Sequence, residues 1–138
     1  MAIRRLRSEP PGPWEEEIGY SRVIRAGPHV WEAGCTSVDE YGVVQGVTPG
    51  EQLTLALANL ARALERVAAS PADVVRTRMY ITDASRWEEV GRAHGAVFAD
   101  IRPVTAMVEV SGFIDPRMLV EVEADAFVAG ADGAPSNT

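Results

Sequence analysis

The segment of residues 118–127 alternates between two kinds of side chain, and no other stretch constrains the fold more strongly. The first set is apolar throughout: Met118, Val120, Val122, Ala124 and Ala126. The second set contains three acids between two apolar ends: Leu119, Glu121, Glu123, Asp125 and Phe127. Side chains with a period of two point to opposite faces of a β-strand. The segment therefore predicts a strand with one face in a core and an acidic face turned away from it.

A long amphipathic helix is predicted to start at Pro49. Thr48 and Glu51 form a capping box, and Pro49 occupies the first helical position, where its missing N–H is not needed. Apolar residues then recur at steps of four and three: Leu53, Leu57, Leu60, Leu64 and Val67. This spacing places them on one stripe, which we expect to face the core.

A strand and a second helix are predicted to follow. On residues 74–81, period two places Val75, Met79 and Ile81 on one side and two arginines and a tyrosine on the other. If the acidic face of 118–127 lies beside this strand, the two strands carry matched charges. The second helix, from about residue 86 to residue 98, has an apolar stripe made of Trp87, Val90, His94 and Val97. We interpret His94 as a packed residue, because no Ser or Cys partner lies near it in the sequence.

The remaining segments complete an α+β domain. Residues 23–26 and 29–34 flank Gly27 and Pro28, which predicts a hairpin, and residues 42–45 add a third short piece. Residues 1–17 are predicted to be an irregular N-terminal arm, residues 18–128 a single domain, and residues 129–138 a flexible tail. The order of elements predicts a mixed β-sheet with two helices packed on one face, which leaves the other face to be covered by something else.

Composition argues against several classes of function. All 13 basic residues are arginine, which removes lysine Schiff-base chemistry and the P-loop lysine, and the net charge of −7 argues against a nucleic-acid partner. No apolar run is long enough for a membrane span, and the N-terminus lacks the apolar core of a secretory signal, so we predict a cytoplasmic location and no membrane partner. Cys35 has no partner for an internal disulfide and no histidine at metal-ligand spacing. We therefore expect Cys35 to be a packed strand residue, and we expect neither a metal nor a cofactor.

Five motifs occur in one order along the chain. They are 19–22 (GYSR), 33–34 (AG), 72–83 (ADVVRTRMYITD), 102–110 (RPVTAMVEV) and 120–124 (VEVEA). In this order they resemble the YjgF/RidA family of reactive intermediate deaminases, some of which carry the endoribonuclease L-PSP label. The resemblance covers about residues 18–128. It implies a RidA/chorismate-mutase-like domain that forms a homotrimer, with a central β-barrel-like interior and small-molecule clefts between subunits.

The resemblance also implies a set of site residues. Substrate-binding positions match Tyr20, Gly34, Thr105 and Met107, and the residue that positions the attacking water matches Glu121, the candidate catalytic residue. In the family pattern R-P-A-R, the second arginine grips the substrate carboxylate, and Thr105 stands in its place here. A threonine hydroxyl has neither the charge nor the bidentate fork of arginine. The chain therefore resembles a divergent subgroup that binds a small metabolite and is not an efficient 2-imino acid deaminase.

Other interpretations remain open. The first alternative is an enamine or imine deaminase, a hydrolase that releases ammonia using Glu121 and water. Its carboxylate anchor would be Arg22, Arg102 or an arginine of another subunit. A weaker alternative is an endoribonuclease, which the charge balance does not favour. Glu121 is also explained without catalysis if the acidic strand face is simply solvated.

Overall fold

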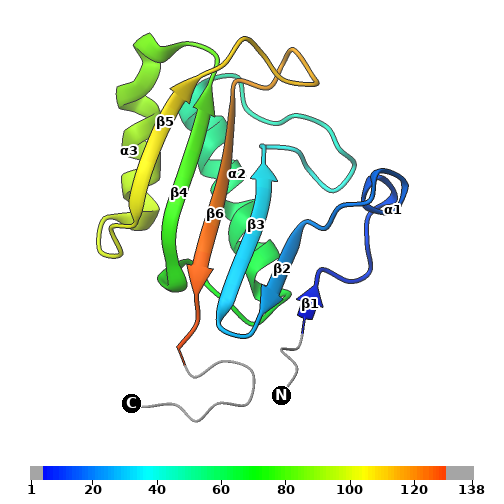
Figure 1. Ribbon diagram of the computed structural model, residues 1–138. Coiled ribbons are helices and arrows are strands. Elements are labelled where there is room, and N and C mark those ends of the chain that lie inside the picture. Colours follow the sequence, from blue (N-terminus) through cyan, green and yellow to red (C-terminus); the bar gives the residue numbers. More distant parts are fainter. Residues whose placement is uncertain (1–4, 130–138) are drawn as a thin grey trace.

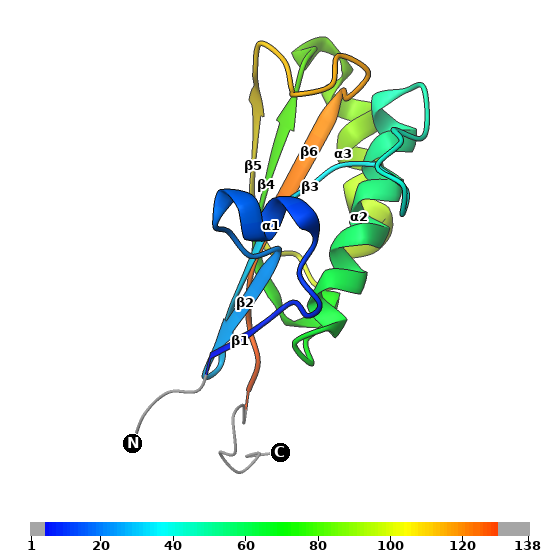
Figure 2. The same cartoon turned by 90° about the vertical axis from the view of Figure 1, so that its right-hand side faces the viewer.

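The computed structural model describes residues 5–129 as one six-stranded sheet with two long helices on one face (Figures 1 and 2). The strands are β1 (Arg5–Arg7), β2 (Val23–Ala26), β3 (His29–Cys35), β4 (Val74–Ile81), β5 (Val104–Glu109) and β6 (Val120–Phe127). The helices are α1 (Pro13–Ile18), α2 (Pro49–Glu65) and α3 (Trp87–Phe98), with 3₁₀ turns at Pro71–Asp73 and Ala84–Arg86. The predicted α+β fold class is confirmed. In Figure 2, α2 and α3 lie on the same side of the sheet, and neither covers the opposite side.

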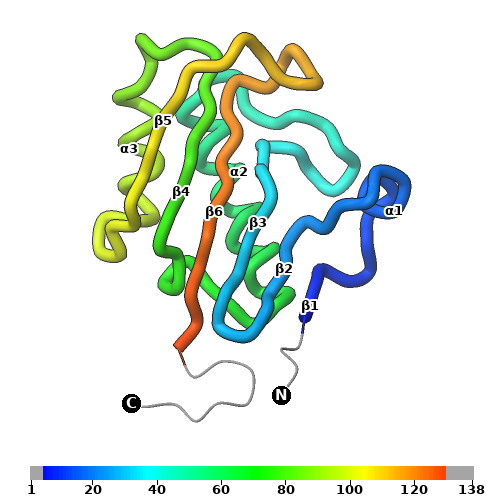
Figure 3. Tube along the Cα trace, in the orientation of Figure 1, coloured from blue at the N-terminus to red at the C-terminus, as the bar shows by residue number. Residues whose placement is uncertain are grey.

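The strand order is β1-β2-β3-β6-β4-β5, and only the β4–β5 pair is parallel, so the sheet is mixed as predicted. A parallel pair needs a crossover connection, and α3 supplies it between β4 and β5. The trace in Figure 3 shows that β6, the last strand in the sequence, enters the middle of the sheet between β3 and β4. The acidic residues of β6 therefore lie in the middle of the sheet, on the face that the helices do not cover.

The apolar patterns of β6 and α2 form the core. Val120, Val122, Ala124 and Ala126 of β6 are buried against the helices. The predicted stripe is buried along α2 and continues two residues past its end: Leu53, Leu57, Leu60, Leu64 and Val67. Both buried faces are as predicted, because each pattern extends over enough residues to specify a single buried face. The strand itself begins at Val120, so Met118 lies before it and is only partly buried.

The predicted inward face of β4 was wrong at one residue. A register shift between Val74 and Arg76 changes the alternation, so Val74 is 3% exposed while Val75 is 50% exposed. A bulge of this kind adds one residue to a strand and moves its neighbour to the other face. Met79 and Ile81 are buried as predicted.

The apolar stripe of α3 also differs from the prediction. Val90 and Phe98 are fully buried and His94 is partly buried, whereas Trp87 and Val97 are exposed. Val90, His94 and Phe98 follow one another at steps of four residues, so the buried face includes Phe98 and not Val97. Trp87 is the first residue of the helix and lies outside this face. The helix itself spans almost the predicted residues.

The N-terminal segment is more regular than predicted. Instead of an irregular arm, residues 5–7 form β1 against the edge of β2, and α1 follows. The side chain of Glu15 accepts a hydrogen bond from the backbone N–H of Gly12, the N-cap residue, and Pro13 opens the helix. The predicted piece at 42–45 is reduced to an isolated bridge between Val38 and Val44. Apart from Ala129, the predicted tail at 129–138 lies outside the described residues, and within residues 5–129 no helix is long and apolar enough to cross a membrane.

Candidate functional site

The predicted site residues fall into two groups that lie apart within one chain. Tyr20 precedes β2, Gly34 lies near the end of β3, and Glu121 lies at the start of β6. Thr105 and Met107 lie on β5, the edge strand beyond β4. Within one chain, Tyr20, Gly34 and Glu121 therefore lie toward the β3–β6 part of the sheet. Thr105 and Met107 lie on the edge strand, β5.

Glu121 packs directly against the backbone of Gly34. A Cβ atom built on Gly34 would lie 2.5 Å from Glu121 Oε1 and 2.6 Å from its Cδ. Only a glycine leaves room for this close approach of a side chain to the strand. The match of Gly34 and Glu121 to one site, made from two motifs far apart in the sequence, is consistent with this contact.

Arg22 joins the same group. Gly19 ends α1 in the left-handed conformation, with φ 86°, and the chain then turns through Tyr20 and Arg22 into β2. The Arg22 guanidinium donates a hydrogen bond to the Gly34 carbonyl, and its central carbon lies 5.8 Å from the centroid of the Tyr20 ring. Of the two arginines named as possible anchors, Arg22 is the one beside Glu121. Arg102 precedes β5 at the far edge of the sheet.

The environment of Glu121 suits a group that exchanges protons. Burial raises the pKa of Glu121, the positive charge of Arg22 opposes this shift, and the negative charge of Glu123 adds to it. A carboxyl group with a raised pKa holds its proton to a higher pH than an exposed glutamate does, and groups that act as an acid or a base are often tuned in this direction.

The other two acids of β6 are engaged in a charged ladder with β4. The Tyr80 hydroxyl donates to Glu123 at 2.6 Å, Arg78 lies 3.5 Å from Glu123, and Arg76 lies 3.8 Å from Asp125. These matched charges were predicted, and because the groups are partly exposed each ion pair contributes about 0–1 kcal/mol. Among residues 5–129, Glu121 alone of the three acids has neither an ion pair nor a hydrogen bond.

Thr105 is part of a hydrogen-bonded chain on the helix side of the sheet. Its hydroxyl lies 2.8 Å from Thr77 Oγ1 and 3.1 Å from the carbonyl of Pro103. Thr77 in turn lies 2.8 Å from Nε2 of His94, whose ring packs on Phe98. Thr105 is exposed, and Met107 packs partly against the core.

His94 is held as a packed residue, and burial lowers its pKa. Its partner, Thr77, comes from β4. The pair could not be predicted from neighbouring residues, because Thr77 and His94 are 17 residues apart and meet only when β4 and α3 pack together.

Sequence reasoning also missed a buried acid, Glu32. Glu32 is 4% exposed, its Oε1 accepts a hydrogen bond from the Cys35 thiol at 2.8 Å, and its Oε2 has no partner within residues 5–129. Burial raises the pKa of Glu32 to about 8 and raises the pKa of the Cys35 thiol as well. Cys35 is buried, as predicted. The missed signal is that Glu32 has the same strand parity as Val30, which faces the core.

The fold and the site together define a class of small α+β proteins. One mixed sheet has two helices on one face, and on the other face a carboxyl group that is unpaired among residues 5–129 lies over a glycine. Comparison with known proteins narrows this class. The family model described as Endoribonuclease L-PSP matches residues 14–128. An uncharacterized protein of Streptomyces coelicolor is 36% identical over 131 residues, which cover 95% of this chain and 96% of that protein.

Solved structures agree with these matches. A member of the YjgF/YER057c/UK114 family from Mycobacterium tuberculosis is 46% identical, with a TM-score of 0.82 over 91% of this chain and all of that chain. RidA from an Antarctic Psychrobacter is 23% identical, with a TM-score of 0.74 over 79% of this chain and 88% of that one, and it shares the fold. The chain therefore belongs to the YjgF/RidA family, whose model carries the endoribonuclease L-PSP description.

Proposed function

We propose that this protein binds a small, weakly anionic metabolite in a cleft between copies of the chain and is not an efficient 2-imino acid deaminase. Tyr20, Gly34 and Glu121 of one copy and Thr105 and Met107 of a neighbouring copy form the cleft. The observation that carries the proposal is the state of Thr105. It is neutral, and its hydroxyl is already hydrogen-bonded to Thr77 and Pro103, so it offers no charged fork to a carboxylate.

The uncovered face of the sheet supports the assembly of copies, which we propose to be a homotrimer. His29 stacks on Trp31 with ring centroids 5.7 Å apart and meets Phe127 edge-on at 5.4 Å. Trp31 and Phe127 are each about half exposed. Aromatic groups gathered on an uncovered sheet face are typical of an interface, and a closed ring of copies would cover them. The proposed location is the cytoplasm, where a single free thiol stays reduced.

A second candidate function is imine hydrolysis with release of ammonia, and Arg22 favours it. The Arg22 guanidinium lies beside Gly34 and close enough to Glu121 to oppose the rise in its pKa. In this alternative Arg22 holds the substrate carboxylate, and Glu121 positions the water that attacks the imine carbon.

Ammonia release from freshly generated 2-iminobutanoate and 2-iminopropionate separates the two functions. We expect the wild type to release ammonia no faster than buffer. The Thr105→Arg variant should release ammonia about tenfold faster than the wild type and buffer do. One charge-assisted contact to the substrate carboxylate contributes enough free energy for that factor. Adding Glu121→Ala to Thr105→Arg should remove the gain. Thr54→Arg, on the exposed side of α2, adds the same charge away from the site and serves as the control.

A wild-type rate well above buffer that disappears in both Arg22→Gln and Glu121→Ala would reject the binding proposal in favour of the hydrolase. An equal gain from Thr105→Arg and Thr54→Arg would show that the position of the arginine does not matter, and would remove Thr105 from the site. Sedimentation of each variant reports whether the assembly is retained.

A further inference from the structure

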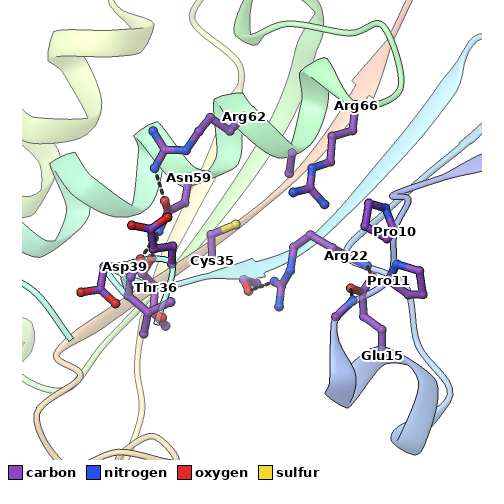
Figure 4. Close-up of a pocket in the computed structure, with 15 residues that line it drawn as sticks. Pro10, Pro11, Glu15, Arg22, Cys35, Thr36, Asp39, Asn59, Arg62 and Arg66 are labelled. Carbon is purple, nitrogen blue, oxygen red and sulfur yellow. Dashed lines mark hydrogen bonds between the residues drawn. The ribbon is translucent and has the colours of Figure 1, made fainter. Parts of the chain in front are cut away.

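A second cleft lies on the helix side of the sheet, away from the face that carries Glu121. It has a volume of about 880 Å³ and opens between the second half of α2, the end of β3 and the segment around α1 (Figure 4). This volume is within the range that small organic ligands fill. Arg22 and Gly34 border both this cleft and the candidate site around Glu121. The other residues that line the cleft are not among the predicted site residues.

Three arginines line this cleft, and none of them forms an ion pair within the described residues. Arg62 lies in the last turn of α2, and Arg66, four residues on, is the C-cap residue and keeps the right-handed helical conformation, so the two side chains project from one face. Arg22 lies across from them in Figure 4. Among residues 5–129, no carboxylate oxygen lies within 4.0 Å of any of these three guanidinium groups. The three guanidinium groups are therefore not held in ion pairs, although the chain has 20 acidic and 13 basic residues.

The arginines differ in how many donors they have free. Arg62 donates to the side-chain oxygen of Asn59, and Arg22 donates to the Gly34 carbonyl. Within the described part of the chain, the guanidinium of Arg66 donates to no protein group, and Figure 4 shows it reaching into the cleft. A guanidinium group presents five N–H donors, so Arg22 and Arg66 both retain donors for a ligand.

Two of the carboxylates at this cleft are already committed to local structure. The Glu15 carboxylate accepts hydrogen bonds from the backbone N–H groups of Gly12 and Arg22 and from the Ser8 hydroxyl. Asp39 accepts from Tyr41 N–H, Val43 N–H and Gln45. Both groups therefore hold loops in place, and Glu40 is exposed at the rim. The charged donors that remain for a ligand among these residues are those of the arginines.

We propose that this cleft binds a small organic anion whose phosphate or carboxylate group is held by Arg22 and Arg66, with Arg62 supplying a further positive charge. The planar guanidinium fork matches the paired oxygens of both groups. Asn59, also on α2, fixes the loop that borders the cleft, because its amide donates to the carbonyls of Thr36 and Val38. This inference does not depend on the function proposed for the Glu121 site.

The test is calorimetric titration of the full chain at low, constant ionic strength, because screening weakens exposed charges. The probes are inorganic phosphate, succinate, glucose 6-phosphate and uncharged glucose. We expect a dissociation constant in the millimolar range or below for at least one anion, and no binding of glucose. Arg66→Gln should weaken anion binding by about tenfold, as expected for one charge-assisted contact.

Arg92→Gln is the matched control. Arg92 lies on α3, pairs with Glu88 and does not line the cleft, and its substitution changes the net charge by the same amount. It should leave the anion affinity unchanged. Equal weakening in Arg66→Gln and Arg92→Gln would show that the whole-protein charge, and not the cleft, attracts the anion, and would overturn the proposal. Absence of binding for all three anions at millimolar concentration would overturn it as well. The relative affinities for phosphate and succinate identify the preferred anionic group.

Discussion

Glu32→Gln will flatten the dependence of stability on pH, with an effect on the order of 4 kcal/mol. The pKa of Glu32 is raised to about 8 in the folded chain, from an ordinary value of 4.5. Below pH 4.5 the carboxyl group is neutral in both the folded and the unfolded chain. Between pH 4.5 and pH 8 the unfolded chain releases this proton and the folded chain retains it. The free energy of unfolding therefore falls by about 1.4 kcal/mol per pH unit over this window and levels off above it.

A glutamine at position 32 has no proton to release, so the variant lacks this contribution. It retains an oxygen that can accept the hydrogen bond from the Cys35 thiol. Urea unfolding of both proteins between pH 5 and 9, at one fixed protein concentration, measures the difference. We expect the wild type to lose about 4 kcal/mol relative to the variant as the pH rises to 8.

Glu65→Gln, at an exposed position on α2, is the control, because it removes an acid without changing a buried group. Its unfolding free energy should follow the wild-type curve. Parallel curves for the wild type and Glu32→Gln would show that Glu32 is solvated or already charged in the folded chain, contrary to the buried position described above.

Glu32 also illustrates where sequence reasoning stops. The strand of residues 118–127 and the stripe of α2 were predictable, because many residues repeat one period and a single buried face satisfies all of them. A lone acid on a short strand has no such support, and its burial depends on Cys35 and on α2, which packs against β3. The bulge at Val75 shows the same limit. One additional residue in β4 changes which side chains face the core, and the period-two pattern does not show where such a residue is inserted.

For the candidate site, the motifs indicate which residues to consider but not how those residues lie in the folded chain. Tyr20, Gly34 and Glu121 were found from motifs, and the folded chain brings them together. The position of Thr105 at the far edge of the sheet follows from strand order, which inserts β6 beside β3 and leaves β5 outside. Arg22 was identified only as one of several possible anchors, because its distance from Gly34 depends on how α1 turns the chain into β2.

The contact between Gly34 and Glu121 yields the second large prediction. Gly34→Ala places a methyl group 2.5 Å from Glu121 Oε1 and 3.0 Å from its Cγ, so the Glu121 side chain has to rotate away. We expect a loss of about 1–3 kcal/mol in the free energy of unfolding, as for other substitutions that overfill a packed position. We also expect the pKa of Glu121 to fall toward its ordinary value, because burial is what raises it and the displaced carboxyl group is more solvated.

A double-mutant cycle isolates this contact. In a Glu121→Ala background the obstructing atoms are absent, so Gly34→Ala should cost less than about 0.5 kcal/mol, and the coupling between the two positions should account for most of the single-mutant loss. Gly91→Ala is the control, because a methyl group there meets nothing within 4 Å and lies inside α3, where alanine favours the helix by up to about 1 kcal/mol. Additive effects of Gly34→Ala and Glu121→Ala would mean that the two residues do not touch in solution. The same result would remove the reason to place Glu121 over the Gly34 backbone, and with it the proposal that one ligand contacts both residues.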